Sequence, residues 1–497
     1  MKSFQQYLTT SEEIGFAEAC NQSIVYASGL PNATLQEIVV FENGELGIIL
    51  SLARDQVEIL LFSQQSVKDG MRVTRTGVKQ EMPVGFELLG KAINPFGHPL
   101  DASKTVEIPK VSRPIDINPT GINTRARIDQ SFETGVSLVD MLIPLGKGQR
   151  ELVIGDRKTG KTSFLYQTIL RQASIGTICI YAAIGRKKTD IKKIEAFFQT
   201  AAIQNNTVII ATSSEDPAGI IYLTPYAAMT LAEYFRDEGH DVLIVMDDLS
   251  AHAKFYREIM LIGRRFPGRN AYPADIFYTH ARLLERSGNF ILPNGSIHSI
   301  TCLPVVESVE GDIAGFIQTN LMSMTDGHIY FDVDMFGKGN RPAINPFLSV
   351  SRVGRQTQNP LRLSLNRELI SFLTLHKKLE SFSHFGSEAG ADVKRTLSVG
   401  ERINGFFTQN ATEVKSLDLQ LIIFCLIWTD YWQDMTKMEK DIEVINDTYK
   451  NSIEAQSLVK ELIDNVQNLN DLLLKVRKQQ DKILNTFRLQ IVTVTNI

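Results

Sequence analysis

The sequence of 497 residues contains little cysteine and little tryptophan, with four Cys and two Trp. The cysteines, Cys20, Cys179, Cys302 and Cys425, are far apart and form no C-x-x-C pair. This spacing argues against a disulfide framework and against zinc sites. We therefore expect reduced thiols that pack in the interior of a cytosolic protein.

Targeting and membrane-spanning patterns are also missing. Residues 1–6 contain neither an apolar signal core nor an arginine-rich transit pattern. The most apolar stretch, residues 419–428, is too short to cross a bilayer and is flanked by Asp418 and Asp430. It predicts a buried helix, and any membrane contact is expected to be made through partner proteins.

Charge of one sign is not in excess. The formal net charge is −4 and the isoelectric point is about 6.1, which argues against a strongly basic nucleic-acid-binding protein. Hydrophobic residues at 43% and charged residues at 22% are typical of a globular protein. The length predicts about three domains.

The most specific motif is a phosphate-binding loop, because residues 155–162 complete the pattern G-x-x-x-x-G-K-[ST] after an apolar strand. Its glycines allow backbone N–H groups to point at phosphate oxygens, and a helix expected over residues 163–172 adds its positive end. Lys161 is expected to neutralise the β- and γ-phosphates, and the Thr162 hydroxyl to bind Mg²⁺. The predicted ATP or ADP ligands in this loop are Gly155, Asp156, Arg157, Lys158, Thr159, Gly160, Lys161 and Thr162.

A second motif, an apolar run that ends in two carboxylates, is expected in proteins that have a phosphate-binding loop. Residues 240–248 form an apolar run that ends in Asp247 and Asp248, as expected of a central parallel strand. Asp247 is predicted to hold Mg²⁺ through a water molecule. Asp248 is expected to form hydrogen bonds near the ion or to cap a helix that begins near Ser250.

A water-activating carboxylate is absent from its usual place. Such a group commonly follows a strand beside the phosphate loop, and the candidate strand spans residues 177–184. The residues after Gly185 are Arg186, Lys187 and Lys188, and a cation cannot accept a proton from water. The site is therefore predicted to bind MgATP without hydrolysing it.

Three regions differ in pattern. Residues 1–82 contain short β-like runs separated by polar turns, which predicts an N-terminal antiparallel β-barrel. Residues 83–365 alternate apolar strands with amphipathic helices, as in a central α/β P-loop domain of the RecA-like type. Residues 366–497 predict a C-terminal α-helical bundle, in which Leu458, Leu462, Val466 and Leu469 share one helix face.

This order of regions resembles that of the subunits of the rotary F-type ATP synthase. Several short sequence blocks are similar to those of the alpha subunit in particular. The matching blocks lie at residues 233–237, 272–278, 282–286, 325–327, 341–345 and 349–352, within a resemblance that runs from about 11 to 410. It implies a regulatory, non-catalytic nucleotide-binding subunit. In this family the catalytic glutamate belongs to beta, and alpha usually has Gln where this chain has Arg186.

The resemblance also implies an arginine finger. Arg352 would reach the catalytic site of a neighbouring beta subunit and stabilise transition-state charge, while Ser349 would shape the same interface. The alternative is that Arg352 pairs with a carboxylate at the strand end. The family positions that enclose the adenine are Phe336, Arg341, Pro342 and Gln409, and the departures near them are Lys158 and Ala411.

The expected partners are beta subunits in an alternating hexamer of three alpha and three beta chains, the central gamma shaft and the peripheral stalk. Residues 384–388 resemble an acidic turn that faces the shaft. The complex would lie on the cytoplasmic face of a bacterial inner membrane and couple ATP synthesis or hydrolysis to proton or sodium flow. The short leader before the barrel favours a divergent, sodium-coupled form that lacks a delta subunit.

Two other classes stay open. A Rho-like RNA-translocating hexamer shares the phosphate loop, but it requires basic loops with aromatic residues, which the run 186–188 lacks. A structural nucleotide binder without a role in chemistry would not need Arg352. Co-purification with a beta-like chain separates these cases.

Overall fold

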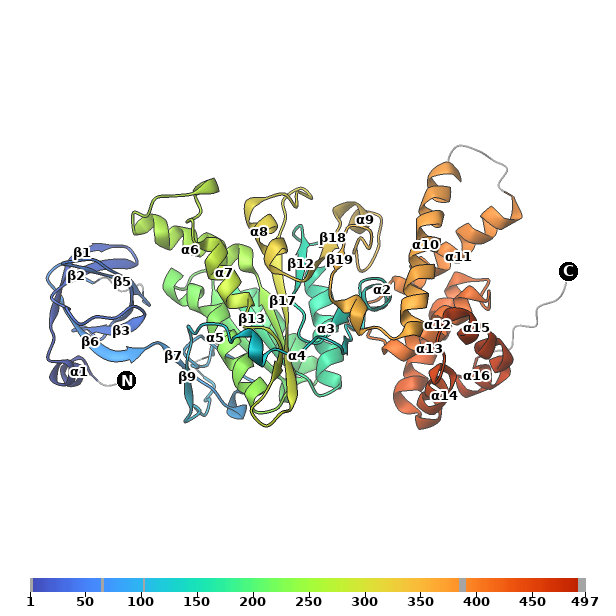
Figure 1. Ribbon diagram of the computed structural model, residues 1–497, viewed down its shortest axis with the longest axis horizontal. Helices are drawn as coiled ribbons and strands as arrows, with labels where there is room; N and C mark the ends of the chain where they lie inside the picture. Colours follow the sequence, from blue (N-terminus) through green and yellow to red (C-terminus); the bar gives the residue numbers. More distant parts are fainter. Residues whose placement is uncertain (1–2, 64–66, 102, 384–389, 490–497) are drawn as a thin grey trace. The chain divides into compact units, whose positions relative to one another are not determined.

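The computed structural model describes residues 3–63, 67–101, 103–383 and 390–489 (Figure 1). The segment 384–388, expected to face a shaft, lies outside the described residues. The chain divides into two compact units. The first comprises Met1–Arg127, Gly148–Ile154 and Ala173–Asp326, and the second comprises Ile128–Lys147, Gly155–Gln172 and Gly327–Ile497. The three-part division at residues 82/83 and 365/366 stays a prediction.

The N-terminal part of the first unit is the predicted barrel. Six strands close antiparallel in the order β1-β2-β5-β4-β3-β6 (Figure 1). Their bounds are β1 Gly15–Asn21, β2 Ile24–Ser28, β3 Glu37–Phe41, β4 Leu46–Leu52, β5 Val57–Leu61 and β6 Arg72–Lys79, and helix α1, Phe4–Ser11, packs on β6. Val25, Val39, Phe41 and Ile59 have no exposed surface in the barrel interior. The sequence pattern did not single out β1, because Gly15, Ala17 and Ala19 are residue types that are depleted in strands.

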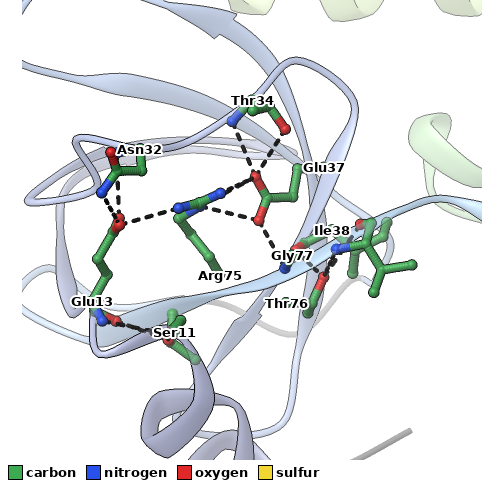
Figure 2. Close-up of polar contacts among 11 residues, drawn as sticks. Ser11, Glu13, Asn32, Thr34, Glu37, Ile38, Arg75, Thr76 and Gly77 are labelled. Carbon is green, nitrogen blue, oxygen red and sulfur yellow. Dashed lines mark hydrogen bonds and ion pairs between the residues drawn. The ribbon is translucent and has the colours of Figure 1, made fainter.

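A polar cluster joins two adjacent barrel strands (Figure 2). The Arg75 guanidinium on β6 pairs with Glu37 on β3 at 3.0 Å and with Glu13 at 3.1 Å. The Glu37 carboxylate also accepts hydrogen bonds from the Thr34 and Gly77 backbone N–H groups. The Glu37 side chain is only 1% exposed, so these donors replace the water that it loses on folding.

The first unit also contains a largely parallel sheet in the order β12-β17-β15-β13-β14-β8, with β16 antiparallel to β17. The bounds are β8 Ala92–Ile93, β12 Glu151–Gly155, β13 Ile178–Arg186, β14 Thr207–Ser213, β15 Val242–Asp247, β16 Gly288–Ile291 and β17 Ile297–Glu307. The short strands β7, Glu81–Pro83, and β9, Ser112–Pro114, pair separately. The sheet confirms the predicted α/β fold.

Helices cover this sheet and bury its strands. α4, Lys188–Thr200, packs on β13 and β14, and α5, Ala218–Asp237, packs on β13, β14 and β15. α6, Leu249–Ile262, packs on β13 and β17. The unit is completed by α7, Ile276–Leu284, and α8, Phe316–Met324. Because β13 and β15 are parallel neighbours, their carboxyl ends lie side by side.

The second unit contains the phosphate-loop helix and the helical C-terminal region. Its smaller elements are α2 Ser137–Leu142, β10 Ser131–Phe132, β11 Leu145–Gly146, α3 Lys161–Ser174, β18 Gly327–Phe331, α9 Val333–Gly337 and β19 Val350–Ser351. The C-terminal helices are α10 Pro360–Ser383, α11 Ala391–Phe407, α12 Leu417–Trp428, α13 Met435–Asn451, α14 Ile453–Ile463, α15 Leu469–Lys478 and α16 Gln480–Thr486. The buried helix predicted over 419–428 is confirmed as α12.

One helical prediction is wrong in detail. Leu458 and Leu462 lie on α14, but Val466 lies in the connection before α15, which begins at Leu469. The chain leaves the helix because Asp464 is extended and Asn465 has φ +64°. The four residues are therefore divided between two short helices and the connection that joins them.

Three of the four cysteines lie in the interior, as expected of packing thiols. Cys179, Cys302 and Cys425 are free and buried, and Cys20 is free and half-buried. Burial raises the pKa of Cys302 to about 12. None of the helices in the described ranges is both long enough and apolar enough to cross a membrane.

Candidate functional site

The phosphate loop connects β12 to α3, and two glycines set its shape. A Cβ atom at Gly155 would lie 2.6 Å from both the Cβ and the carbonyl oxygen of Phe331, so a larger residue does not fit without movement. Gly160 has φ +98° with open space around its Cβ position. Lys158 also has a positive φ, of 64°, and is exposed. The loop therefore has the tight turns that a phosphate cradle requires.

The Lys161 side chain lies across this loop. Its ammonium donates to the carbonyl oxygens of Gly155 at 2.7 Å and Asp156 at 2.6 Å, and it is largely buried. The Thr159 hydroxyl donates to the same Asp156 carbonyl at 2.7 Å. Thr162, in the first turn of α3, is exposed. This arrangement places a cation and a helix N-terminus together, as phosphate binding requires.

The carboxyl ends of β13 and β15 hold a cation and two carboxylates. The Arg186 guanidinium on β13 pairs directly with Asp247 on β15, and it lies 3.3 Å from Asp248 and 4.0 Å from Glu307. The buried Tyr181 hydroxyl donates to Asp247 at 2.6 Å. Burial alone would lower the pKa of Arg186, but the charges of Asp247 and Asp248 outweigh it and raise that pKa.

Asp248 confirms its predicted capping role. Its carboxylate accepts a 2.6 Å hydrogen bond from the Ala251 backbone N–H and begins α6. Burial raises the pKa of Asp248 above the usual range, against the opposing effect of Arg186. Asp248 is thus a structural group with its oxygens directed to the backbone and to a guanidinium.

The donor set does not fit a magnesium ion held through Asp247. The exposed Thr162 hydroxyl can bind a cation or a phosphate oxygen. In contrast, Asp247 Oδ1 accepts from Arg186 and Asp247 Oδ2 accepts from Tyr181. The Arg186 guanidinium already neutralises the Asp247 carboxylate and carries a positive charge of its own, so it opposes a second cation at this position. The Arg186 guanidinium therefore competes with magnesium for Asp247, the residue predicted from the sequence to hold the ion.

The residues expected around the adenine form a compact group in the second unit. The Arg341 guanidinium carbon lies 3.6 Å from the centre of the Phe336 ring, and its Nη1 donates to the Phe336 carbonyl at 3.0 Å. Pro342 follows directly and is half-buried. These stacked planar surfaces suit a flat heterocycle.

Gln409 is tied into the same group. Its backbone N–H donates to the Arg341 carbonyl at 2.8 Å. Its side-chain oxygen accepts from the Ser137 backbone at 2.7 Å, and its amide nitrogen donates to the Gly135 carbonyl at 3.0 Å. These bonds make Gln409 a connector that positions Arg341, and direct contact between Gln409 and a base stays a prediction.

Arg352 follows β19 and is exposed. Among the described residues it has no carboxylate partner, in contrast to the alternative in which it pairs at the strand end. The Ser349 hydroxyl donates to the Asn345 carbonyl at 2.7 Å and accepts from the Tyr330 backbone at 2.9 Å. Ser349 therefore holds the strand connection in shape, and Arg352 extends from it.

Comparison with known proteins decides the family. The model described as the ATP synthase alpha/beta family, nucleotide-binding domain, matches residues 135–351, and the ATP synthase alpha/beta chain, C terminal domain, matches residues 364–487. ATP synthase subunit alpha of Clostridium acetobutylicum is 40% identical over 408 residues, covering 82% of this chain and 80% of that protein. ATP synthase subunit alpha of Dictyoglomus thermophilum is 41% identical over 414 residues, covering 83% and 81%. This chain belongs to the ATP synthase subunit alpha family.

Within this alpha-family chain one buried acid, Asp140, was not predicted from the sequence. Asp140 on α2 accepts hydrogen bonds from the Thr134 hydroxyl at 2.7 Å, the Gly135 backbone at 3.0 Å and the Gln420 amide at 2.9 Å. Burial raises its pKa to about 6. A lone carboxylate in the apolar run 136–145 is the signal that could have indicated a buried, hydrogen-bonded acid.

Proposed function

We propose that this chain is a non-catalytic, nucleotide-binding subunit of a membrane-associated rotary ATP synthase. It alternates with beta-type subunits in a hexamer around a central shaft and connects to a peripheral stalk. The complex couples ATP synthesis or hydrolysis to proton flow or, as the divergent residues favour, to sodium flow. It lies on the cytoplasmic face of a bacterial membrane, and partner subunits make the membrane contacts.

The single observation that carries this proposal is the pairing of Arg186 with Asp247. A hydrolytic site of this class needs a group that orients and polarises water beside the phosphates. The guanidinium in that place has no lone pair to accept a proton and is held by buried carboxylates. The chain therefore binds ATP or ADP through its phosphate loop without hydrolysing it.

The exposed Arg352 gives this subunit its role in chemistry. A guanidinium with no ion partner among the described residues is available to a neighbouring chain, where it can approach two phosphate oxygens at once. In the proposed hexamer the Arg352 side chain completes the beta-type catalytic site. Ser349 positions the strand connection that carries it.

Reconstitution tests this function. The purified chain is mixed with the beta-type chain from the same source, and complex formation and steady-state ATP hydrolysis are measured for each chain and for the mixture. We expect a mixed hexamer with multisite turnover and no significant turnover by this chain alone. Failure to associate with a beta-type chain, or turnover by the isolated chain at the rate of the mixture, would contradict the proposal.

A further inference from the structure

A cluster of charged side chains lies at the carboxyl ends of β13 and β15. Its members are Arg186, Asp247, Asp248 and Glu307. Three carboxylates surround one guanidinium within 4.0 Å. The side chains of Asp247 and Asp248 are only 6% and 4% exposed, and that of Arg186 is 26% exposed. Removing Arg186 would leave two neighbouring buried acids without a counter-charge, which is strongly unfavourable.

In a magnesium-dependent site without Arg186, a divalent cation would neutralise the negative charge of Asp247 at this position. Mg²⁺ requires octahedral oxygen ligands and gives up its water reluctantly, so it is held best by a carboxylate whose negative charge no other cation neutralises. Arg186 and the Tyr181 hydroxyl take one Asp247 oxygen each. A guanidinium is also always charged, so ordinary changes of pH do not release the carboxylate.

The backbone explains why this arginine reaches this aspartate. β13 and β15 run parallel, and Ala183 is in register with Asp247. Arg186, three residues further along β13, follows a bulge in the pairing with β14 and lies beside the end of β15. The pairing therefore follows from the position of these two strands as neighbours in the sheet.

We propose that Arg186 replaces the magnesium ion as the counter-charge of Asp247, so that this chain binds nucleoside di- and triphosphates without a divalent cation. The inference rests on the nucleotide site of the proposed function and concerns what that site requires. The phosphate charge is met by Lys161, the loop N–H groups and the N-terminus of α3.

Equilibrium titration of the purified chain with ATP, in magnesium and in EDTA, tests the inference. We expect wild-type affinity to differ by about threefold or less between the two conditions. Arg186→Gln frees Asp247 and should create a magnesium dependence of about tenfold or more, the size of effect that neighbouring groups have on metal sites. The matched control is Lys187→Gln, which removes an adjacent exposed charge and should behave as wild type.

Mn²⁺ binding, followed by electron paramagnetic resonance on the ATP-loaded chain, gives a second readout. We expect no stoichiometric Mn²⁺ site in the wild type and one in Arg186→Gln. A wild-type chain that releases ATP in EDTA, or that binds one Mn²⁺ per nucleotide, overturns the inference even if the variant does not fold. Absence of ATP binding in both magnesium and EDTA would instead contradict the proposed nucleotide site.

Discussion

The Ser351 hydroxyl donates a 2.6 Å hydrogen bond to the carbonyl oxygen of Pro144. The chain passes the same carbonyl again at Gly354, where a Cβ atom would lie only 1.7 Å from that oxygen. Arg352 lies between these two contacts and is exposed. The turn after β19 is thus held on both sides of an exposed arginine, the residue proposed to act in a neighbouring chain.

The first prediction concerns Arg352. Arg352→Ala should leave folding, assembly and ATP binding to this chain nearly unchanged, because the side chain has no ion partner among the described residues. Multisite turnover of the hexamer should fall by on the order of 10³ or more, as with arginine fingers elsewhere. Arg352→Lys should restore little, since an ammonium lacks the planar two-pronged geometry. Steady-state hydrolysis and nucleotide occupancy of reconstituted hexamers measure both effects.

The control for this experiment is Arg367→Ala, which removes an exposed arginine on α10. It should leave turnover unchanged. Normal turnover in the Arg352→Ala hexamer would show that the arginine does not act in the neighbouring site.

The second prediction concerns Lys161. Lys161→Ala removes the ammonium that lies over the loop carbonyls, so nucleotide binding to this chain should be lost. The beta-type sites of the hexamer should stay occupied. Counting bound nucleotide per hexamer measures this, with Lys187→Ala as the matched loss of an exposed positive charge. An unchanged count would show that the nucleotide binds elsewhere.

The third prediction concerns the barrel. Glu37→Gln weakens the ion pair with Arg75 and leaves that guanidinium partly uncompensated between two strands (Figure 2). We expect the free energy of unfolding to fall by about 3 kcal/mol. Urea denaturation followed by circular dichroism measures the change. Glu42→Gln breaks a pair with Arg72 that is open to solvent, so it should have little effect, and equal losses in the two variants would contradict this view.

The fourth prediction concerns the pH dependence of stability through Asp140. Burial raises its pKa in the folded chain to about 6, above the ordinary value of 3.8. The folded state therefore holds the proton more tightly than the unfolded chain. This contribution to stability is complete below the ordinary pKa and is lost as the pH rises through about 6.

Asp140→Asn removes this titration, although it also changes the hydrogen bonds with Thr134 and Gly135. Between about pH 7.5 and about pH 5, the wild type should gain about 1 kcal/mol of unfolding free energy relative to the variant. Urea midpoints at the two pH values measure the difference. Parallel pH profiles for the two proteins would exclude a raised pKa at Asp140.

Much of the fold could be predicted because its signals are local. The phosphate loop is a contiguous pattern, and the barrel strands β2 to β6 and the helix α12 follow from short runs of buried residues. The strand β1 and the break between α14 and α15 could not be predicted, since a strand rich in Gly and Ala and a single residue with positive φ leave weak patterns.

The sequence by itself determined that a cation, and not a carboxylate, stands at the end of the strand β13, and that this chain resembles the alpha rather than the beta subunit. Only the tertiary structure decided what that cation does. Arg186 meets Asp247 because two strands far apart in the chain are neighbours in the sheet, and Gln409 meets Ser137 in the same way. Local patterns record which residues are buried and how the backbone turns. Pairing between distant side chains depends on packing, which no local pattern contains.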